Sequence, residues 1–271
     1  MNDRLAKLRH VVLDMDGTIY LGHKLFADAL PFLATLRELG VGYSFVTNNC
    51  SRSRAEYVEH LRELGIAAPP DSVVTSSHAA IHHLRTHLPQ VRRLFVLGSP
   101  GGNEDLRLGG FEIVDEAPDA VVVGFDQDVT YGRLCRTAYF IKQGLPYIAT
   151  HPDRVCPTNE ATVLPDCAAF CALLETATGR KPDAIPGKPH PAMLEEVMTR
   201  YKLAADETAM IGDRLYTDVR MARDAGVLAV LTLTGEASGV EAAQLPATAR
   251  PDMIVNDLEV FSRQLLVARE A

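Results

Sequence analysis

Tryptophan is absent from the chain of 271 residues, and aromatic residues make up only 6% of it. Long apolar runs are absent too. The longest span about six residues, far fewer than the ~20 that a helix needs to cross a bilayer. The first residues, Met1 to Lys7, contain no apolar stretch of the kind that a signal peptide carries. We therefore expect a cytoplasmic protein without membrane-spanning segments.

Positive charge is in short supply. Lysine and arginine number 27 against 35 aspartate and glutamate residues, which gives a formal net charge of −8. Nucleic-acid-binding proteins usually present a basic face, so this balance argues against nucleic acid as a partner. An anionic small molecule stays compatible, because a cation or metal ion can reverse the field inside one cleft. We expect no membrane partner and leave a homodimer open.

Paired cysteines are also lacking, because the five cysteines are odd in number and form no CxxC motif. A zinc site would need further ligands at a suitable spacing, which the sequence does not show. We therefore expect free thiols in a reducing compartment. The five are Cys50, Cys135, Cys156, Cys167 and Cys171.

Short apolar runs alternate with longer amphipathic stretches along the whole chain, which is long enough for two domains. We expect strands at 11–13, 41–46, 73–74, 94–97, 120–123, 147–149, 208–211, 227–231 and 253–255. We expect helices at 29–39, 54–64, 79–88, 131–142, 166–178, 192–201, 215–225 and 258–268. This alternation predicts an α/β fold with mostly parallel sheets. The proline-rich stretch 181–191 cannot be regular, and it is the best candidate for a crossing between domains.

Acidic side chains follow the first predicted strand, at the position where ligands of parallel sheets bind. The segment is DMDGT, at residues 14–18. Two carboxylates two residues apart can project to one side of an extended backbone, and they resist ionising together unless a cation intervenes. One of Asp14 and Asp16 can then serve as nucleophile or metal ligand, and the other as acid and base. Alone, the segment is equally typical of an Asx-type turn.

Two later segments can hold a phosphoryl group. Thr47, Asn48 and Asn49 follow the second predicted strand, where hydroxyl and backbone N–H groups can bind phosphoryl oxygens at the start of a helix. The plain alternative is that they only cap that helix. Lys188 stands in the segment GKP, whose backbone is constrained, and it can neutralise a phosphoryl oxygen. The alternative here is a solvated lysine in a loop.

A last acidic segment, GDRLYTD at residues 212–218, follows the strand expected at 208–211. It places Asp213 at a strand end and Asp218 at the start of a helix. Carboxylates of this kind suit Mg²⁺, which keeps several waters and takes few protein ligands. Acidic residues that stabilise a helix N-terminus are an equally good interpretation of this segment alone.

In this order, DMDGT, strand-Thr-Asn, GKP and GD-x4-D resemble the four motifs of the haloacid dehalogenase superfamily of phosphohydrolases. The resemblance covers essentially the whole chain. It implies a Rossmann-like core with a doubly wound, mostly parallel sheet. It also implies a phosphatase rather than a dehalogenase, since dehalogenases lack an acid/base carboxylate at the position of Asp16. The transporting ATPases of the superfamily carry Lys-Thr-Gly-Thr after the nucleophile, and this chain does not.

The resemblance also implies a role for each acidic motif residue. Asp14 attacks phosphorus and forms an aspartyl-phosphate. Asp16 protonates the leaving oxygen and then deprotonates the water that hydrolyses the intermediate. Mg²⁺ is held by the Asp14 carboxylate, the Asp16 backbone carbonyl and the Asp213 carboxylate. Asp218 supports these ligands without binding the ion, or binds it through water. Thr47, Asn48 and Lys188 bind the non-bridging oxygens.

The insert between the TNN and GKP segments is similar to the large α/β cap of the NagD-like, or p-nitrophenylphosphatase-like, branch. We place the catalytic core at 1–78 plus 183–271 and the cap at 79–182. The branch includes phosphatases of sugar phosphates, nucleotides, phosphoglycolate and pyridoxal phosphate. The resemblance thus implies hydrolysis of a small cytosolic phosphomonoester, without naming which one.

The sequence departs from the family pattern at two places in the cap. His151 stands where the family usually has Asn, and Leu164–Ala169 replaces an expected glycine-rich stretch. Cap residues read the leaving group in such enzymes, and our candidate contacts are His151, Asp153, Arg154 and Asp166. Ordinary cap packing is the alternative for each of them.

Four histidines at helical spacing, His78, His82, His83 and His87, suggest a metal site at first sight. No acidic or cysteine partner accompanies them, so we favour a solvated helix face.

Two functions compete with hydrolysis. A phosphotransferase or mutase would use the same nucleophile with another acceptor. A non-catalytic module would bind a phosphorylated ligand without turnover, although Asp14 and Asp16 together argue against it, since a pure binder has no use for an acid/base group.

Overall fold

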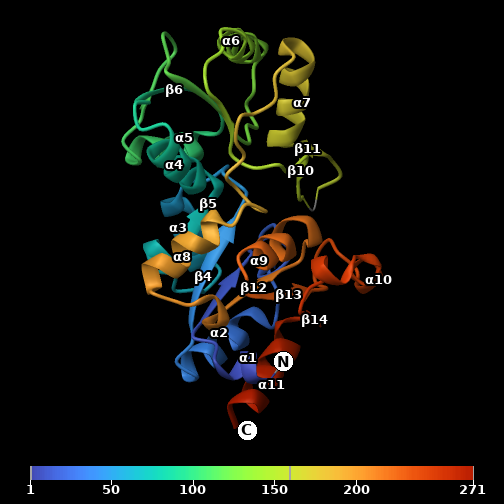
Figure 1. Ribbon diagram of the computed structural model, residues 1–271. Coiled ribbons are helices and arrows are strands. Elements are labelled where there is room, and N and C mark those ends of the chain that lie inside the picture. Colours follow the sequence, from blue (N-terminus) through green and yellow to red (C-terminus); the bar gives the residue numbers. More distant parts are fainter. Residues whose placement is uncertain (1, 159, 271) are drawn as a thin grey trace. The chain divides into compact units, whose positions relative to one another are not determined.

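The computed structural model describes residues 2–158 and 160–270 (Figure 1). Its contacts divide the chain into two compact units. Unit 1 comprises residues 1–46, 61–73 and 189–271, and unit 2 comprises residues 47–60 and 74–188. The core and cap boundaries expected from the sequence remain a proposal.

The larger sheet has six strands in the order β14-β13-β12-β1-β4-β5. β1 pairs in parallel with both β4 and β12, β12 with β13, and β13 with β14. The strands are β1 His10–Leu13, β4 Gly42–Thr47, β5 Val73–Thr75, β12 Thr208–Gly212, β13 Leu228–Thr232 and β14 Met253–Val255. The expected α/β fold with a mostly parallel sheet is confirmed.

The chain winds from β1 through β4 towards one edge of this sheet, and from β12 through β13 to β14 at the other edge. Because parallel crossovers are right-handed, such a reversal puts helices on both faces, and ligands of such sheets bind beyond the carboxyl ends of the strands where the order reverses, here β1 and β12. The helices that precede, connect or follow these strands in the sequence are α1 Asn2–Ala6, α2 Ala29–Glu38, α3 Arg54–Glu63, α8 Ala192–Tyr201, α9 Arg220–Asp224, α10 Gly239–Gln244 and α11 Leu258–Glu270. Short 3₁₀ turns occupy Pro70–Ser72, Ala205–Glu207 and Ala247–Ala249.

Unit 2 contains a smaller sheet of four parallel strands in the order β7-β6-β8-β9. The strands are β6 Arg93–Leu97, β7 Glu112–Ile113, β8 Ala120–Val123 and β9 Tyr147–Ala149. The helices are α4 Ser76–His87, α5 Pro100–Leu108, α6 Tyr131–Lys142 and α7 Cys167–Thr178. α4 contacts α5, and α6 contacts α7.

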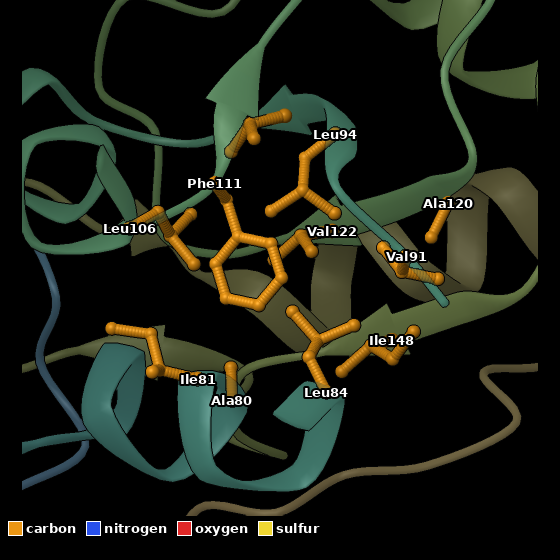
Figure 2. Packing of buried hydrophobic residues seen from close by; sticks show 11 residues of the cluster. Ala80, Ile81, Leu84, Val91, Leu94, Leu106, Phe111, Ala120, Val122 and Ile148 are labelled. Atoms are coloured by element: carbon orange, nitrogen blue, oxygen red, sulfur yellow. The ribbon is translucent and has the colours of Figure 1, made fainter. Parts of the chain in front are cut away.

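Alternating strand residues supply a hydrophobic core on each face of the smaller sheet, as the two-residue period of a strand requires. Val122 and Ile148 belong to the core that includes α4 and α5, in which Phe111 lies near the centre (Figure 2). Val121 and Tyr147 belong to the other core, with residues of α6 and α7. The strands are therefore apolar throughout, because both faces are covered.

Helix α5 is the largest element that the sequence did not predict. Its first turn contains Gly101 and Gly102, which lower helix propensity. The glycines are needed for close packing, since a side chain at Gly101 would collide with the backbone of Arg52 and Ser53. The helix forms because Ser99 caps it, with its Oγ accepting from the Gly102 N–H.

The helix expected at 215–225 is wound differently from the prediction. Residues Leu215–Val219 form a π-helical turn, and only Arg220–Asp224 is α-helical. Two small antiparallel pairs were not predicted: β2 Tyr20–Leu21 with β3 Lys24–Leu25, and β10 Val155–Cys156 with β11 Leu164–Pro165. The other predicted helices and strands are present, with ends that shift by up to three residues.

Several smaller expectations can be checked. All five cysteines are free thiols. No helix within residues 2–158 and 160–270 is both long enough and apolar enough to span a membrane. The four histidines of α4 form no group of three potential metal ligands among the described residues. Instead, the His78 ring lies 2.8 Å from Thr75 Oγ1, and the His83 and His87 rings pack 4.7 Å apart.

Two leucines of α5 provide a matched test of the unit 2 core. Leu106 is 1% exposed and belongs to the core of Figure 2, whereas Leu108 is 74% exposed. We expect Leu106→Ala to lower the free energy of unfolding by about 2–5 kcal/mol, because it leaves a cavity. Leu108→Ala should change it by less than about 0.5 kcal/mol. Urea unfolding followed by circular dichroism measures both, and equal losses would contradict the packing described here.

Candidate active site

The DMDGT segment forms a tight turn at the end of β1. The Asp14 N–H donates to the Ile211 carbonyl at 2.9 Å, so the parallel ladder with β12 continues one residue past β1. The Met15 carbonyl then accepts from the N–H groups of residues 18–20 at 2.9–3.2 Å. Gly17 adopts φ +88°, which favours glycine. The turn buries the Asp14 side chain and leaves Asp16 half-buried.

The GDRLYTD segment carries two buried carboxylates at the end of β12. Asp213 Oδ2 accepts from the Glu236 N–H at 2.7 Å, and the Asp213 carbonyl accepts from the Ala237 N–H at 3.0 Å. The π-helical turn then returns Asp218 to the strand end, where its Oδ2 accepts from the Arg214 N–H at 3.2 Å. Single π-helical turns are frequent at functional sites because they re-aim side chains in this way.

Asp14, Asp213 and Asp218 each offer a carboxylate oxygen, and these oxygens lie within 4.8 Å of one another. Burial, followed by the charges of Asp14 and Asp218, raises the pKa of Asp213 to about 8. Among the described residues, Asp213 Oδ1 has no hydrogen-bond partner although it is buried. Buried carboxylates that repel one another, with an oxygen that no donor satisfies, fit a hard divalent cation such as Mg²⁺.

A segment after β13 packs against these carboxylates, and the sequence analysis missed it. Thr234 Oγ1 donates to the Gly17 carbonyl at 2.6 Å. Gly235 lies so close that a side chain there would collide with the Asp213 carboxylate. The next residue, Glu236, supplies the N–H to Asp213 Oδ2. The segment carries no acidic pair or lysine that would draw attention, and the only signal was a glycine following the strand at 227–231.

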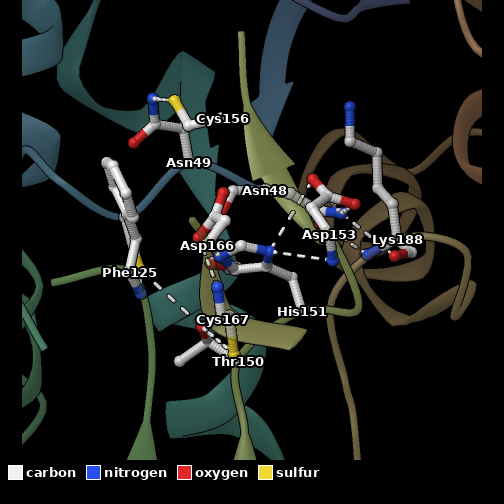
Figure 3. A network of polar contacts seen from close by, with 12 residues as sticks. Asn48, Asn49, Phe125, Thr150, His151, Asp153, Cys156, Asp166, Cys167 and Lys188 are labelled. Atoms are coloured by element: carbon white, nitrogen blue, oxygen red, sulfur yellow. Dashed lines mark hydrogen bonds and ion pairs between the residues drawn. The ribbon is translucent and has the colours of Figure 1, made fainter. Parts of the chain in front are cut away.

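A second polar cluster lies in unit 2, around the GKP segment (Figure 3). Asn48 Oδ1 accepts from the Lys188 N–H at 2.8 Å, and Asn48 Nδ2 donates to the Lys188 carbonyl at 3.1 Å. The Gly187 N–H donates to the Thr150 carbonyl at 2.9 Å. Thr47 Oγ1 accepts from the N–H of Asn49 at 3.1 Å.

Three of the four cap candidates lie together behind Asn48 (Figure 3). Both Asp153 oxygens lie 3.3 Å from Asn48 Nδ2. His151 Nδ1 lies 3.7 Å from Asp153 Oδ2, and His151 Nε2 lies 3.4 Å from Asp166 Oδ1. All three residues are buried, whereas Arg154 is exposed. Direct contact of these four with a substrate remains a prediction.

The structure thus brings together Asp14, Asp213 and Asp218 in unit 1. It separately brings together Asn48, Lys188, Asp153, His151 and Asp166 in unit 2.

Known proteins are similar to most of this chain. Residues 11–112 match the model of a family described as haloacid dehalogenase-like hydrolase, and residues 185–261 match an HAD-hydrolase-like family. The chain is 34% identical to a D-glycerol 3-phosphate phosphatase of Mycobacterium tuberculosis, over 92% of this chain and 69% of that protein. It is 33% identical to the 5'-nucleotidase YutF of Bacillus subtilis, over 83% of this chain and 86% of that one.

Solved structures are similar over the full length. A 4-nitrophenylphosphatase of Thermotoga maritima superposes with a TM-score of 0.90 at 38% identity, covering 96% of this chain and 98% of that one. A glycerol phosphate phosphatase of M. tuberculosis in complex with magnesium superposes with a TM-score of 0.87 at 33% identity, covering 96% of this chain and 78% of that one. The chain therefore belongs to the haloacid dehalogenase-like hydrolases, in the NagD-like and p-nitrophenylphosphatase-like branch.

Proposed function

We propose that this protein is a magnesium-dependent phosphatase that hydrolyses a small phosphomonoester through an aspartyl-phosphate on Asp14. Phosphoric monoester hydrolysis is the activity that its relatives are named for, and the chain is an enzyme of this class. The observation that carries the proposal is the group of three buried carboxylates at the ends of β1 and β12, in which Asp213 Oδ1 has no hydrogen-bond donor among the described residues.

The acidic turn supplies the covalent chemistry in this proposal. An Asp14 oxygen forms a bond to phosphorus while the bond from phosphorus to the leaving oxygen breaks, and Asp16 gives that oxygen a proton. Asp16 then takes a proton from a water molecule, whose oxygen attacks phosphorus and releases Asp14 and inorganic phosphate. The half-buried position of Asp16 suits a group that must exchange its proton with solvent.

The remaining motif residues position and neutralise the phosphoryl group. The Asp14 and Asp213 carboxylates and the Asp16 carbonyl would hold Mg²⁺, and Asp218 would keep them in place. When bound, the ion withdraws negative charge from the phosphoryl oxygens. Thr47 and Lys188 would bind those oxygens, with the backbone N–H near Asn48 assisting, since positioning and charge neutralisation are most of what phosphoryl transfer requires.

The substrate is proposed only as a class. Relatives are named for glycerol 3-phosphate, nucleotides and sugar phosphates, so a small cytosolic metabolite of the sugar phosphate, nucleotide, phosphoglycolate or pyridoxal phosphate type is expected. Among the cap candidates, the exposed Arg154 is the one that we retain as a direct substrate contact. The buried candidates contact Asn48 or one another.

Replacing the nucleophile tests the reaction. We expect Asp14→Asn to lower kcat by at least about a thousandfold with an unchanged fold, because the amide cannot form the covalent intermediate. Asp206→Asn is the matched control, because that carboxylate is exposed. The measurement is magnesium-dependent phosphate release from a panel of phosphorylated metabolites.

Labelled water separates the competing functions in the same assay. Hydrolysis places one solvent oxygen in each released phosphate, whereas a phosphotransferase or mutase moves the phosphoryl group without it. Ligand binding with no phosphate release from any compound would support a non-catalytic module and overturn the proposal.

The raised pKa of Asp213 predicts how pH affects the metal-free protein. Its folded pKa of about 8 lies above the ordinary 3.8, so its contribution to stability is complete below pH 3.8 and is lost as the pH rises through about 8. One bound proton changes the free energy of unfolding by about 1.4 kcal/mol per pH unit. In EDTA, the wild type should therefore lose up to about 2 kcal/mol between pH 6 and pH 8, relative to Asp213→Asn. Parallel curves for the two proteins in thermal unfolding would contradict this prediction.

Gly235 tests how the carboxylates are held. A side chain there would collide with Asp213, so Gly235→Ala should weaken Mg²⁺ binding by about tenfold or more, as judged by calorimetry. Gly239→Ala is the matched control, because the nearest atom to a Cβ at Gly239 lies 3.9 Å away. Equal Mg²⁺ affinities for the two variants would show that this close approach has no role in metal binding.

A further inference from the structure

The backbone of the GKP loop is held by specific contacts. The Asn48 carboxamide pairs with both the N–H and the carbonyl of Lys188, at 2.8 and 3.1 Å. A side chain at Gly187 would collide with the Thr150 carbonyl, so the loop lies directly against that strand end. Residues 48, 150, 187 and 188 all belong to unit 2. The orientation of the Asn48 amide therefore determines where the Lys188 side chain leaves the backbone.

Asp153 fixes that orientation. A carboxamide can be turned over, which exchanges its donor and acceptor ends. Both Asp153 oxygens lie 3.3 Å from Asn48 Nδ2, so an ionised carboxylate accepts the second Nδ2 hydrogen while the first goes to the Lys188 carbonyl. In the flipped amide, Oδ1 would face this carboxylate. A carboxylate accepts this hydrogen more strongly than a neutral carboxyl group does.

A charged Asp153 in this place needs a counter-charge, because Asp166 lies on the other side of the His151 ring. Asp153 and Asp166 are 5% and 2% exposed, and His151 is completely buried. Each ring nitrogen faces a different carboxylate, Nδ1 at 3.7 Å and Nε2 at 3.4 Å. Asp166 in turn caps α7, with its Oδ1 accepting from the Cys167 N–H at 2.6 Å. Figure 3 shows the ring standing between the two acids.

A ring nitrogen thus faces each carboxylate, and Nδ1 also accepts from the Asp153 N–H at 3.4 Å. Burial alone would lower the pKa of His151, but the charge of Asp166, together with contacts to Cys50 and the charge of Asp153, raises it to about 9. His151, Asp153 and Asp166 also offer one potential metal-ligand atom each, within 4.8 Å of one another, but an imidazole between the two acids can pair with both without an ion.

We infer that His151 and Asp166 are positioning residues for the phosphate-binding pair Asn48 and Lys188, and that they act through Asp153. The inference rests on the proposed function for the role of Lys188. It connects the two places where the sequence analysis expects a departure from the family pattern, His151 and the stretch that contains Asp166. The imidazolium offsets the negative charge of Asp166, so that Asp153 keeps its own charge and its hydrogen bonds to Asn48.

The inference predicts an unusual pattern of variants. His151→Asn restores the family residue but leaves Asp153 and Asp166 without the cation between them, so their repulsion favours protonation of one acid. We expect it to weaken the binding of inorganic phosphate by about tenfold. Asp166→Asn alone should change this affinity by less than about threefold, since one acid and one cation remain. The double variant should return to within about threefold of the wild type, because the acid and its counter-charge leave together.

The measurement is calorimetric titration of the full chain with inorganic phosphate in the presence of Mg²⁺, well below the unfolding temperature of each variant. His78→Asn is the matched control, because His78 also lies beside an acid, with its Nδ1 3.7 Å from Asp105 Oδ2. It should lower the unfolding temperature without changing phosphate affinity. Phosphate binding needs no turnover, so a wild type that binds phosphate but hydrolyses nothing would sink the proposed function and leave this test usable.

Two results would overturn the inference. One is a His151→Asn variant that binds phosphate within about twofold of the wild type. The other is a double variant that binds no better than His151→Asn. If His151→Asn does not fold, Asp153→Leu takes its place, because it keeps a similar side-chain shape and removes both oxygens that accept from Asn48. An unchanged phosphate affinity in Asp153→Leu would equally overturn it.

Discussion

Repulsion among buried carboxylates is the constraint on which the proposed catalytic centre depends. At ~4 Å, two like charges near a protein surface repel by about 4 kcal/mol, and Asp14, Asp213 and Asp218 place oxygens within 4.8 Å of one another. Such a group of carboxylates stays together only when the surrounding backbone fixes the position of each residue. The hydrogen bonds between β1 and β12 fix the position of the Asp14 backbone, and the Glu236 N–H donates to the Asp213 carboxylate and holds it in place. A proton on Asp213 or a bound cation then relieves the repulsion.

The second cluster meets the same problem in a different way. Asp153 and Asp166 are buried acids too, but the imidazole of His151 lies between them and supplies the positive charge from within the chain. In our proposals, a cation from outside completes the first cluster, whereas the second already has an imidazole between its acids. This difference is why we assign metal binding to the first group and the positioning of a loop to the second.

The fold and the motif residues were predictable from the sequence to the extent that each depends on local pattern. Apolar runs buried on both faces marked the strands of both sheets, and α6 begins and ends where its periodicity predicted. Helix α5 was missed because its glycines serve contacts with a distant segment rather than local propensity. The π-helical turn at Leu215–Val219 was missed because Asp218 must return to the end of β12, which periodicity does not express. The role of Thr234 and Gly235 depends wholly on what they pack against.

The sequence by itself determined the α/β class, the family and the order of the motif residues, because those follow from hydrophobic period and from residue types that only certain chemistry requires. Only the tertiary structure decided which acids lie close together, which side chain holds the Lys188 backbone, and that His151 stands between Asp153 and Asp166. Such decisions rest on contacts between segments that lie far apart along the chain. Charge balance across those contacts is a property of the folded molecule, and no single segment carries it.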